Sequence, residues 1–295
     1  MLENHHGNLQ PQWALPESAQ FSTFPFLPNR KPYLRRMLNN LLLKGPYENP
    51  QLWSTLGWLD VVQGYRRSML GPFWITLSMA IQAGAMTIVF GAIFGVPAKE
   101  YAAYVITGLV GWTWVSALIT EMGNTFVVHG GYIKGMRIDK AQLIWAMAYK
   151  QIIVLGHNLI VFAIAVMVGA IPLTIYTLLF IPAVVIFFLM TIPFTAATAI
   201  LFARYRDLPR LASSVIVIVM LLTPVFWDPA MMTGWRSLIY QLNPIYYCIE
   251  FLRQPLLGKA PDPIIIAVFL SMTAAAWIAG SYFYRRYNRY VVFWV

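Results

Sequence analysis

Residues 129–142 read HGGYIKGMRIDKAQ, a basic stretch that holds three closely spaced glycines, Gly130, Gly131 and Gly135. A loop that cradles phosphates needs the order G-x-x-x-x-G-K-[ST], in which backbone N–H groups point inward and a lysine meets the phosphates. Lys134 lies near these glycines, but the order is wrong. We therefore expect no ATP hydrolysis by this route, and no nucleotide or other cofactor on this chain.

Acid–base chemistry has few candidate residues. The sequence contains no G-x-S-x-G elbow, no H-E-x-x-H and no pair of acids within an apolar run. Ionisable groups inside membrane spans are costly, and are therefore functional candidates by default. Only Glu121 and His157 qualify. We expect Glu121 at an interface and His157, beside Asn158, in a hydrogen bond to a neighbouring helix.

Metal and disulfide chemistry has little basis in this sequence. The single cysteine, Cys248, cannot form an internal disulfide, and no CxxC or His/Cys cluster predicts a metal site. We expect Cys248 to be a small buried residue, and we expect no metal.

The composition indicates whether this chain lies in water or in a membrane. Of its 295 residues, 59% are hydrophobic and only 11% are charged, whereas soluble chains have about a quarter charged. The net charge of +10 favours cytoplasmic loops that follow the positive-inside bias over a nucleic-acid partner. We therefore predict an all-α integral membrane protein.

Six apolar runs approach the roughly 20 residues that a helix needs to cross a bilayer core of about 30 Å. They are residues 73–96, 101–120, 151–170, 173–203, 211–227 and 264–284, of which the fifth is short. The outer segments 97–100 and 228–263 carry four basic and four acidic residues, so the whole excess of positive charge falls elsewhere. This distribution predicts six spans with both termini in the cytosol.

Three segments flank or interrupt the spans. Residues 1–50 are rich in proline and predict a cytosolic, largely irregular tail. Residues 51–72 predict an amphipathic helix in the inner interface, with Leu52, Leu56, Leu59 and Val62 on one stripe and Asp60, Arg66 and Arg67 largely off it. Between the last two spans, helical spacing on either side of Asn243-Pro244 predicts two short helices that dip into the outer half of the membrane.

Aromatic residues gather in the predicted outer half of the membrane. Such residues form headgroup-level belts in membrane proteins, and they also suit sugars, because flat rings offer apolar faces to pyranose C–H bonds. Composition alone leaves both interpretations open. The candidates for a channel or outer-gate lining are Tyr101, Tyr104, Trp112, Trp114, Phe226, Trp227, Tyr246 and Tyr247.

The order of these features resembles a known family. The stretches YRRSMLGPFW, GGYIKGMRIDK, RYRDLPRL, TPVFW and LNPIYYCIEFLRQPLLG follow one another among the six spans. Over residues 51–295 the chain resembles the permease subunit of type-2 ABC exporters of bacterial surface polysaccharide, the Wzm-like permeases. The resemblance implies a six-span permease domain over 73–295 in the bacterial inner membrane, paired with a second copy.

The resemblance also implies a partner and a coupling segment. Two ABC ATPase subunits would bind the ATP and Mg²⁺, and the segment 130–140 would dock into them. Its apolar contacts would be Ile133, Met136 and Ile138, and its charged contacts Lys134, Arg137, Asp139 and Lys140. Arg204 and Asp207 would form a second ATPase contact, and the helix with Asp60, Arg66 and Arg67 a gate at the cytosolic mouth.

The function expected from these features is export of a lipid-linked, O-antigen-like polysaccharide through a channel between two permeases. One alternative is a type-2 exporter of another cargo, such as capsule, teichoic acid, a drug or a lipid. A second alternative is a membrane-embedded enzyme of glycan assembly, which would require essential polar residues such as Glu121 and His157. Membrane lipids are the remaining expected partners.

Overall fold

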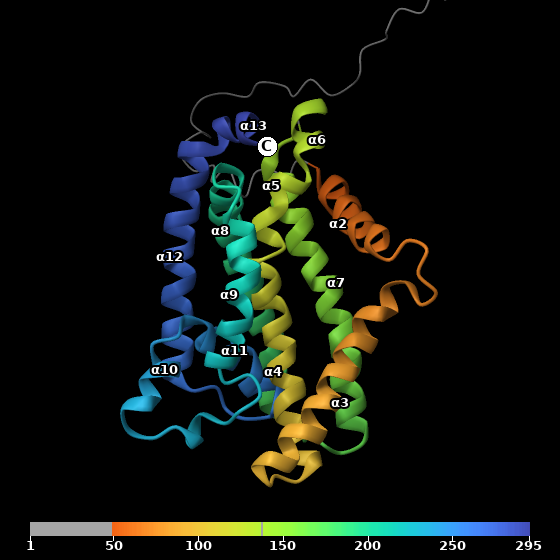
Figure 1. Cartoon of the computed structure of the whole chain (residues 1–295), viewed down its shortest axis with the longest axis vertical. Coiled ribbons are helices and arrows are strands. Elements are labelled where there is room, and N and C mark those ends of the chain that lie inside the picture. The colour runs from red at the N-terminus through yellow and green to blue at the C-terminus, as the bar shows by residue number, and fades with distance from the viewer. Residues whose placement is uncertain (1–48, 137) are drawn as a thin grey trace, which may run out of the picture. The chain divides into compact units, whose positions relative to one another are not determined.

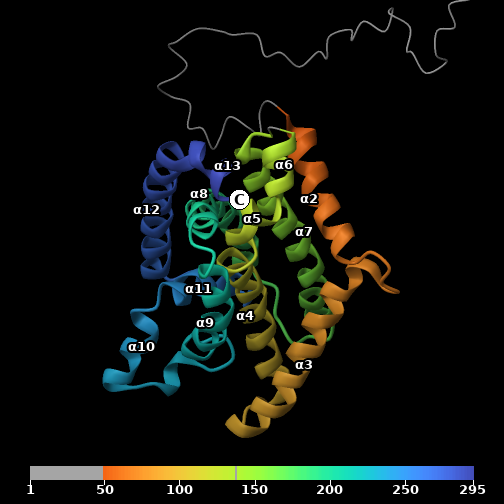
Figure 2. The ribbon, with the colours of Figure 1, turned by 45° about the horizontal axis from the view of Figure 1, so that its top comes forward.

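The computed structural model describes residues 49–136 and 138–295. All of them belong to one contact unit, Asn40–Val295. The predicted tail over residues 1–50 lies almost wholly outside the described residues, and so does Arg137. Within the described part of the chain every regular element is a helix, as Figures 1 and 2 show. The prediction of an all-α chain is confirmed for these residues.

The helices follow one another in chain order with short connections. Four shorter elements precede or join the early helices: α2 (Pro50–Gly64), η3 (Met122–Asn124), α5 (Thr125–Val128) and α6 (Gly130–Gly135). The long helices are α3 (Trp74–Phe94), α4 (Ala98–Ile119), α7 (Lys140–Met167), α8 (Phe180–Arg204), α9 (Leu208–Leu222) and α12 (Pro263–Tyr287). The remaining elements are η2 (Gly71–Phe73), η4 (Ile175–Leu179), η5 (Pro229–Met231), η6 (Gly234–Ser237), α10 (Leu238–Gln241), α11 (Pro244–Leu256), η7 (Asn288–Tyr290) and α13 (Val291–Trp294).

Five segments are long and apolar enough to cross a membrane, and they contain α3, α4, α7, α8 and α12. Five of the six predicted spans are thus present as long apolar helices. The remaining one, the fifth predicted span at 211–227, is the shorter helix α9, which ends at Leu222. Pro224 explains the early end, because the residue before a proline disfavours the α conformation, and Thr223 is indeed extended.

The third span begins earlier than the sequence predicted. It was expected at 151–170, whereas α7 starts at Lys140. The carboxylate of Asp139 accepts a hydrogen bond from the backbone N–H of Ala141 at 3.1 Å and so caps this helix. Asp139 and Lys140 are therefore part of the start of a long helix rather than of a free loop.

Helix α2 differs from the amphipathic helix predicted over 51–72. It ends at Gly64, and Arg66 and Arg67 follow in an exposed turn. Gly57 and Val61 are buried, whereas Leu59 and Val62 of the predicted apolar stripe are exposed. Trp53 packs against Trp145 of α7, with ring centroids 5.8 Å apart. Helix α2 is thus fixed to α7 by a face that includes Trp53 and Gly57 and only part of the predicted stripe, since Leu56 is partly buried against the core.

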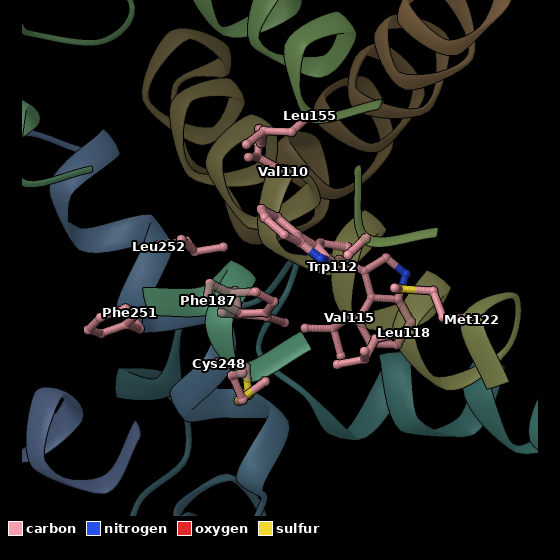
Figure 3. Close-up of a cluster of buried hydrophobic side chains, with 14 of the residues drawn as sticks. Val110, Trp112, Val115, Leu118, Met122, Leu155, Phe187, Cys248, Phe251 and Leu252 are labelled. Atoms are coloured by element: carbon pink, nitrogen blue, oxygen red, sulfur yellow. The ribbon is translucent and has the colours of Figure 1, made fainter. Parts of the chain in front are cut away.

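Helix α4 forms the centre of the bundle, because more of its span is buried than of any other span. It contacts α3, α7, α8, α9 and α11. Figure 3 shows side chains of α4, among them Val110, Trp112 and Leu118, in one buried cluster with Phe187 of α8 and Phe251 of α11. Any outer gate built on α11 is therefore packed directly on the central helix.

The two short helices predicted between the last spans are present. The first consists of η6 and α10, and the second is α11. Asn243 separates them and accepts a hydrogen bond from the N–H of Ile245 at 3.0 Å, which caps α11. In Figures 1 and 2, α10 lies toward one end of the helices, while α6 and α13 lie at the opposite end.

Candidate functional site

The predicted coupling segment forms the short helix α6 and a connection to α7. Ile133 is buried and Ile138 is partly buried against the core, whereas Met136 is 68% exposed. Lys134 and Tyr132 are exposed as well. Two of the three predicted apolar contacts thus anchor the segment in the protein, and the exposed side chains among its described residues include Tyr132, Lys134 and Met136.

The coupling segment is tied to the last span and to the C-terminus. The hydroxyl of Tyr284 in α12 donates a hydrogen bond to the Asp139 carboxylate at 3.2 Å. Gly130 lies against Val295, because a Cβ at this glycine would be 3.4 Å from the Val295 Cβ. A displacement of the segment would therefore act on both α7 and α12.

A buried histidine links the coupling segment to α2. The Nδ1 atom of His129 lies 2.9 Å from the Thr125 carbonyl oxygen, and its Nε2 atom lies 3.3 Å from a carboxylate oxygen of Asp60. Both partners only accept hydrogen bonds, so a single imidazole satisfies both only when both of its nitrogens carry protons. Asp60, predicted in the gate helix, thus contacts the residue that directly precedes α6.

Glu121, a candidate from the sequence, is also paired. Its carboxylate forms an ion pair with Lys150 and accepts a hydrogen bond from Gln151 at 3.3 Å, both on α7. His157 bonds through Nδ1 to the Ile153 carbonyl one turn earlier on the same helix, at 2.9 Å. The Glu121 contacts join the turn after α4 to α7. The His157 side chain bonds within α7 and not, as expected, to a neighbouring helix, and these contacts assemble no acid–base pair.

The outer aromatic residues fall into two groups. Five of the eight are buried within the chain, namely Tyr101, Trp112, Trp114, Phe226 and Trp227. Tyr104, Tyr246 and Tyr247 are partly buried. The buried members contribute to packing, and the role of the set as a channel or outer-gate lining stays a prediction.

Two tyrosines of α4 hold the segment that follows α9. The Tyr101 hydroxyl donates to the Phe226 carbonyl, and the Tyr104 hydroxyl donates to the Trp227 carbonyl at 2.8 Å. Residues 223–227 do not form a helix, so their carbonyl groups lack the backbone hydrogen bonds that a helix would provide. The tyrosines therefore supply hydrogen bonds that the broken helix lacks.

Arg253 of α11 is the central polar residue of this region, and sequence reasoning missed it. Its side chain is fully buried. It donates to the Tyr104 hydroxyl and to the Glu250 carboxylate, each at 2.7 Å, and to the Val225 carbonyl at 2.8 Å. The i, i+3 spacing of Glu250 and Arg253 on an otherwise apolar helix was the available signal.

A glycine of α4 gives Arg253 its space. A Cβ at Gly108 would lie 2.2 Å from the nearer guanidinium nitrogen and 2.5 Å from the Val225 carbonyl oxygen. Both distances are shorter than any normal contact, so only glycine fits without rearrangement. Gly108 therefore lets α4, α11 and residues 223–227 meet at one point.

Cys248, also on α11, is inert. It is buried, and burial raises the pKa of its thiol to about 12. A thiol with this pKa is not a nucleophile or a metal ligand at neutral pH. Within the described residues no group of three His, Cys, Asp or Glu side chains is placed to bind a metal ion.

The long apolar helices define a multi-pass membrane protein. Residues 51–257 match the family described as ABC-2 type transporter. Because this match covers more than half of the chain, the chain belongs to that family, and it is a membrane component of an ABC transporter. Membership implies an ABC ATPase as its partner.

A curated protein is also similar. It is the O-antigen export system permease protein RfbA of Klebsiella pneumoniae, with 23% identity over 194 residues. The aligned region covers 63% of this chain and 72% of that protein. The resemblance to a Wzm-like, type-2 permease that the sequence motifs indicated is thus confirmed.

Proposed function

We propose that this chain is the permease subunit of an ATP-driven exporter that moves a lipid-linked, O-antigen-like polysaccharide across the bacterial inner membrane. Family membership supports the transporter class, and the name of the Klebsiella relative supports the cargo. ATP and Mg²⁺ bind to the partner ATPase, which is present in two copies. This chain contributes the pathway and the parts that respond to the ATPase.

The chain crosses the membrane six times, with α9 as the fifth crossing. A helix of 15 residues is about 22 Å long, which is shorter than a bilayer core of about 30 Å. Residues 223–227 are buried against α4 and extend the crossing without exposing their carbonyl groups to lipid. The positive-inside distribution of charge supports cytosolic termini.

Two copies of the chain form the channel. Helix α9 has no buried residue within the protomer, and its exposed apolar side chains include Val217, Ile218 and Leu221. A second copy related by a two-fold axis covers such a face and encloses a pathway wider than one bundle of six helices offers.

The arrangement of α6 is the observation that carries the coupling proposal. Tyr132, Lys134 and Met136 are exposed at one end of the molecule, while Ile133 and Asp139 fix the same segment to the core and to α12. An ATPase that binds these exposed side chains can therefore move α7 and α12. The charged side chains of Arg137 and Lys140 complete this contact in the proposal.

The other predicted roles follow from the same orientation. Arg204 ends α8 and Asp207 lies in the turn that follows, and these two residues form the second ATPase contact. Helix α2 and the turn with Arg66 and Arg67 form the cytosolic gate, which the Asp60–His129 contact connects to the coupling segment. The aromatic residues around α11 form the outer gate.

Deletion of the gene followed by glycan analysis tests the proposal. The expected result is loss of one surface polysaccharide together with accumulation of its lipid-linked form inside the cell, reversed by the wild-type gene. An unchanged set of surface glycans would refute the proposed cargo class. Complementation by a Glu121→Gln/His157→Asn variant is expected to restore export, because neither residue has a catalytic role in this proposal.

A further inference from the structure

A pocket of about 490 Å³ opens where α8 and α12 end. Ile200, Leu201 and Phe283 line its apolar side, and Arg204, Arg286 and Trp294 line its polar side. This volume lies within the range of small-molecule sites, about 300–1,000 Å³. The pocket is separate from the coupling surface of α6 and from the Arg253 cluster described above.

The pocket lies between two helices that touch closely elsewhere. A Cβ at Gly280 of α12 would lie 2.1 Å from the Pro193 carbonyl oxygen of α8. The pocket opens nearer the arginine-bearing ends of the two helices, where Leu201 and Arg204 of α8 and Phe283 and Arg286 of α12 line it. The C-terminus closes one side, because Arg206 donates a hydrogen bond to the Trp294 carbonyl at 3.1 Å.

The rim of the pocket carries positive charge that the described residues do not neutralise. Neither Arg204 nor Arg286 forms an ion pair with a carboxylate of residues 49–136 or 138–295. The flanking segments 204–210 and 285–289 hold six arginines and a single acidic residue, Asp207. An anion in the pocket would therefore meet two cations without competition from a carboxylate on the rim.

Aromatic rings surround the arginines. The guanidinium carbon of Arg204 lies 5.3 Å from the ring centroid of Trp294 and 5.9 Å from that of Tyr205. Tyr287 and Tyr290 pack on Trp294, with ring centroids 6.5 and 6.1 Å from it. Aromatic and basic residues at the ends of membrane spans lie at the level of the lipid headgroups, which places the rim at that level.

We propose that this pocket binds one anionic phospholipid. Its phosphate lies between Arg204 and Arg286, and the first methylenes of its acyl chains lie against Leu201 and Phe283. Basic pockets between membrane helices bind anionic headgroups in this way. The assignment to the cytosolic leaflet rests on the orientation given under Proposed function, but binding itself does not depend on the cargo.

A lipid fits the pocket better than a loop of the ATPase does. The apolar lining comes from the membrane-crossing parts of α8 and α12, so an occupant must bring apolar groups into the hydrocarbon region. A phospholipid carries such groups directly beneath its phosphate. Asp207 and the exposed turn remain free for the ATPase. The Arg204 side chain binds the lipid phosphate in this proposal, which replaces its part in the second ATPase contact given under Proposed function.

Occupancy of the pocket has a structural consequence. Trp294 belongs to α13, which contacts α6, and Val295 packs against Gly130 at the start of α6. A lipid that holds Arg204 and Trp294 in place therefore also supports the coupling segment. Anionic lipid should stabilise the purified permease.

Native mass spectrometry of the purified full chain tests this proposal. The chain is mixed with equal amounts of phosphatidylglycerol and phosphatidylethanolamine, and the bound lipid is counted. Wild type is expected to retain one phosphatidylglycerol preferentially. Each of Arg204→Gln and Arg286→Gln should weaken that binding about fivefold, because a basic residue near the membrane contributes about this factor to anionic lipid binding.

The matched control is Arg236→Gln, an exposed arginine that stacks on Trp235 near α10 and should leave binding unchanged. If the wild-type chain retains the two lipids equally, the proposal is wrong. This outcome requires no variant, so the test remains decisive even if a variant misfolds. Displacement of the lipid by free glycerol phosphate at comparable concentration would also overturn it, since the acyl chains would then contribute nothing. If Arg286→Gln abolishes ATPase binding but not lipid retention, the pocket is a docking site for protein and the lipid assignment is wrong.

Discussion

The guanidinium of Arg253 lies over the ring of Tyr104, 4.1 Å from its centroid, and one of its nitrogens donates to the hydroxyl of the same tyrosine. The two residues are 149 positions apart in the chain. Their contact joins the central helix α4 to α11 and, through Val225 and Trp227, to the break after α9. A buried polar cluster thus holds α4, α11 and the segment after α9 together within an apolar bundle.

Removal of the Tyr104 hydroxyl should weaken this cluster. In Tyr104→Phe, Arg253 loses one hydrogen-bond acceptor and the Trp227 carbonyl loses its donor. Hydrogen bonds to charged groups contribute about 1.5–3 kcal/mol, so the thermal unfolding midpoint of the purified chain should fall measurably. Tyr282→Phe is the control, because Tyr282 is 62% exposed. Equal midpoints for the two variants would show that the cluster does not stabilise the fold.

The coupling segment allows the effects of stability and of docking to be separated. Ile133→Ala removes a buried side chain and should destabilise the protein by about 2–5 kcal/mol. Lys134→Ala/Met136→Ala changes only exposed side chains, and should leave the unfolding midpoint unchanged while it reduces co-purification of the ATPase. The matched control is Met231→Ala, an exposed methionine in η5. Full ATPase recovery with Lys134→Ala/Met136→Ala would exclude this surface as the contact.

The contact between Asp60 and His129 should have a measurable coupling energy. Asp60→Asn and His129→Gln each remove the ion pair between α2 and the coupling segment. In a double-mutant cycle on stability the two changes should be non-additive by about 1 kcal/mol, since contacting residues couple by roughly 0.5–3 kcal/mol. Additive effects would mean that α2 and the coupling segment are energetically independent.

The single cysteine makes the chain suitable for a topology measurement. Cys248 is buried with a raised pKa, so a membrane-impermeant maleimide should label the native chain only after denaturation. Met136→Cys should then react from the cytosolic side and Met231→Cys from the opposite side. Labelling of both from the same side would contradict the proposed orientation.

Much of the fold could be predicted from sequence because membrane spans are defined by local composition. The long helices follow from runs of apolar residues that are visible in the sequence. The two short helices and the cap at Asn243 follow from the Asn243-Pro244 pair, which interrupts such a run. The sequence alone did not indicate that α7 begins at Lys140, because a basic residue at a helix start looks like loop sequence. The Asp139 cap explains it afterwards.

The candidate site was harder to predict because its contacts join distant residues. Arg253 was counted only as an outer-loop charge, yet it is fully buried by partners from α4 and from the break after α9. Ile133 and Met136 look equivalent in sequence, but Ile133 is buried within α6, whereas Met136 directly follows the helix and is 68% exposed. Which face of a short helix is buried depends on tertiary packing, which a six-residue pattern does not encode.

Transport into inverted membrane vesicles tests the central claim most directly. Vesicles that contain the permease and its ATPase are supplied with lipid-linked polymer and ATP, and polymer protected from an added glycosidase is measured. We predict protection that requires ATP and both proteins, and that is lost with Lys134→Ala/Met136→Ala but not with Met231→Ala. Protection that develops equally without the permease or without ATP would contradict the claim that this chain is the permease of an ATP-driven polysaccharide exporter.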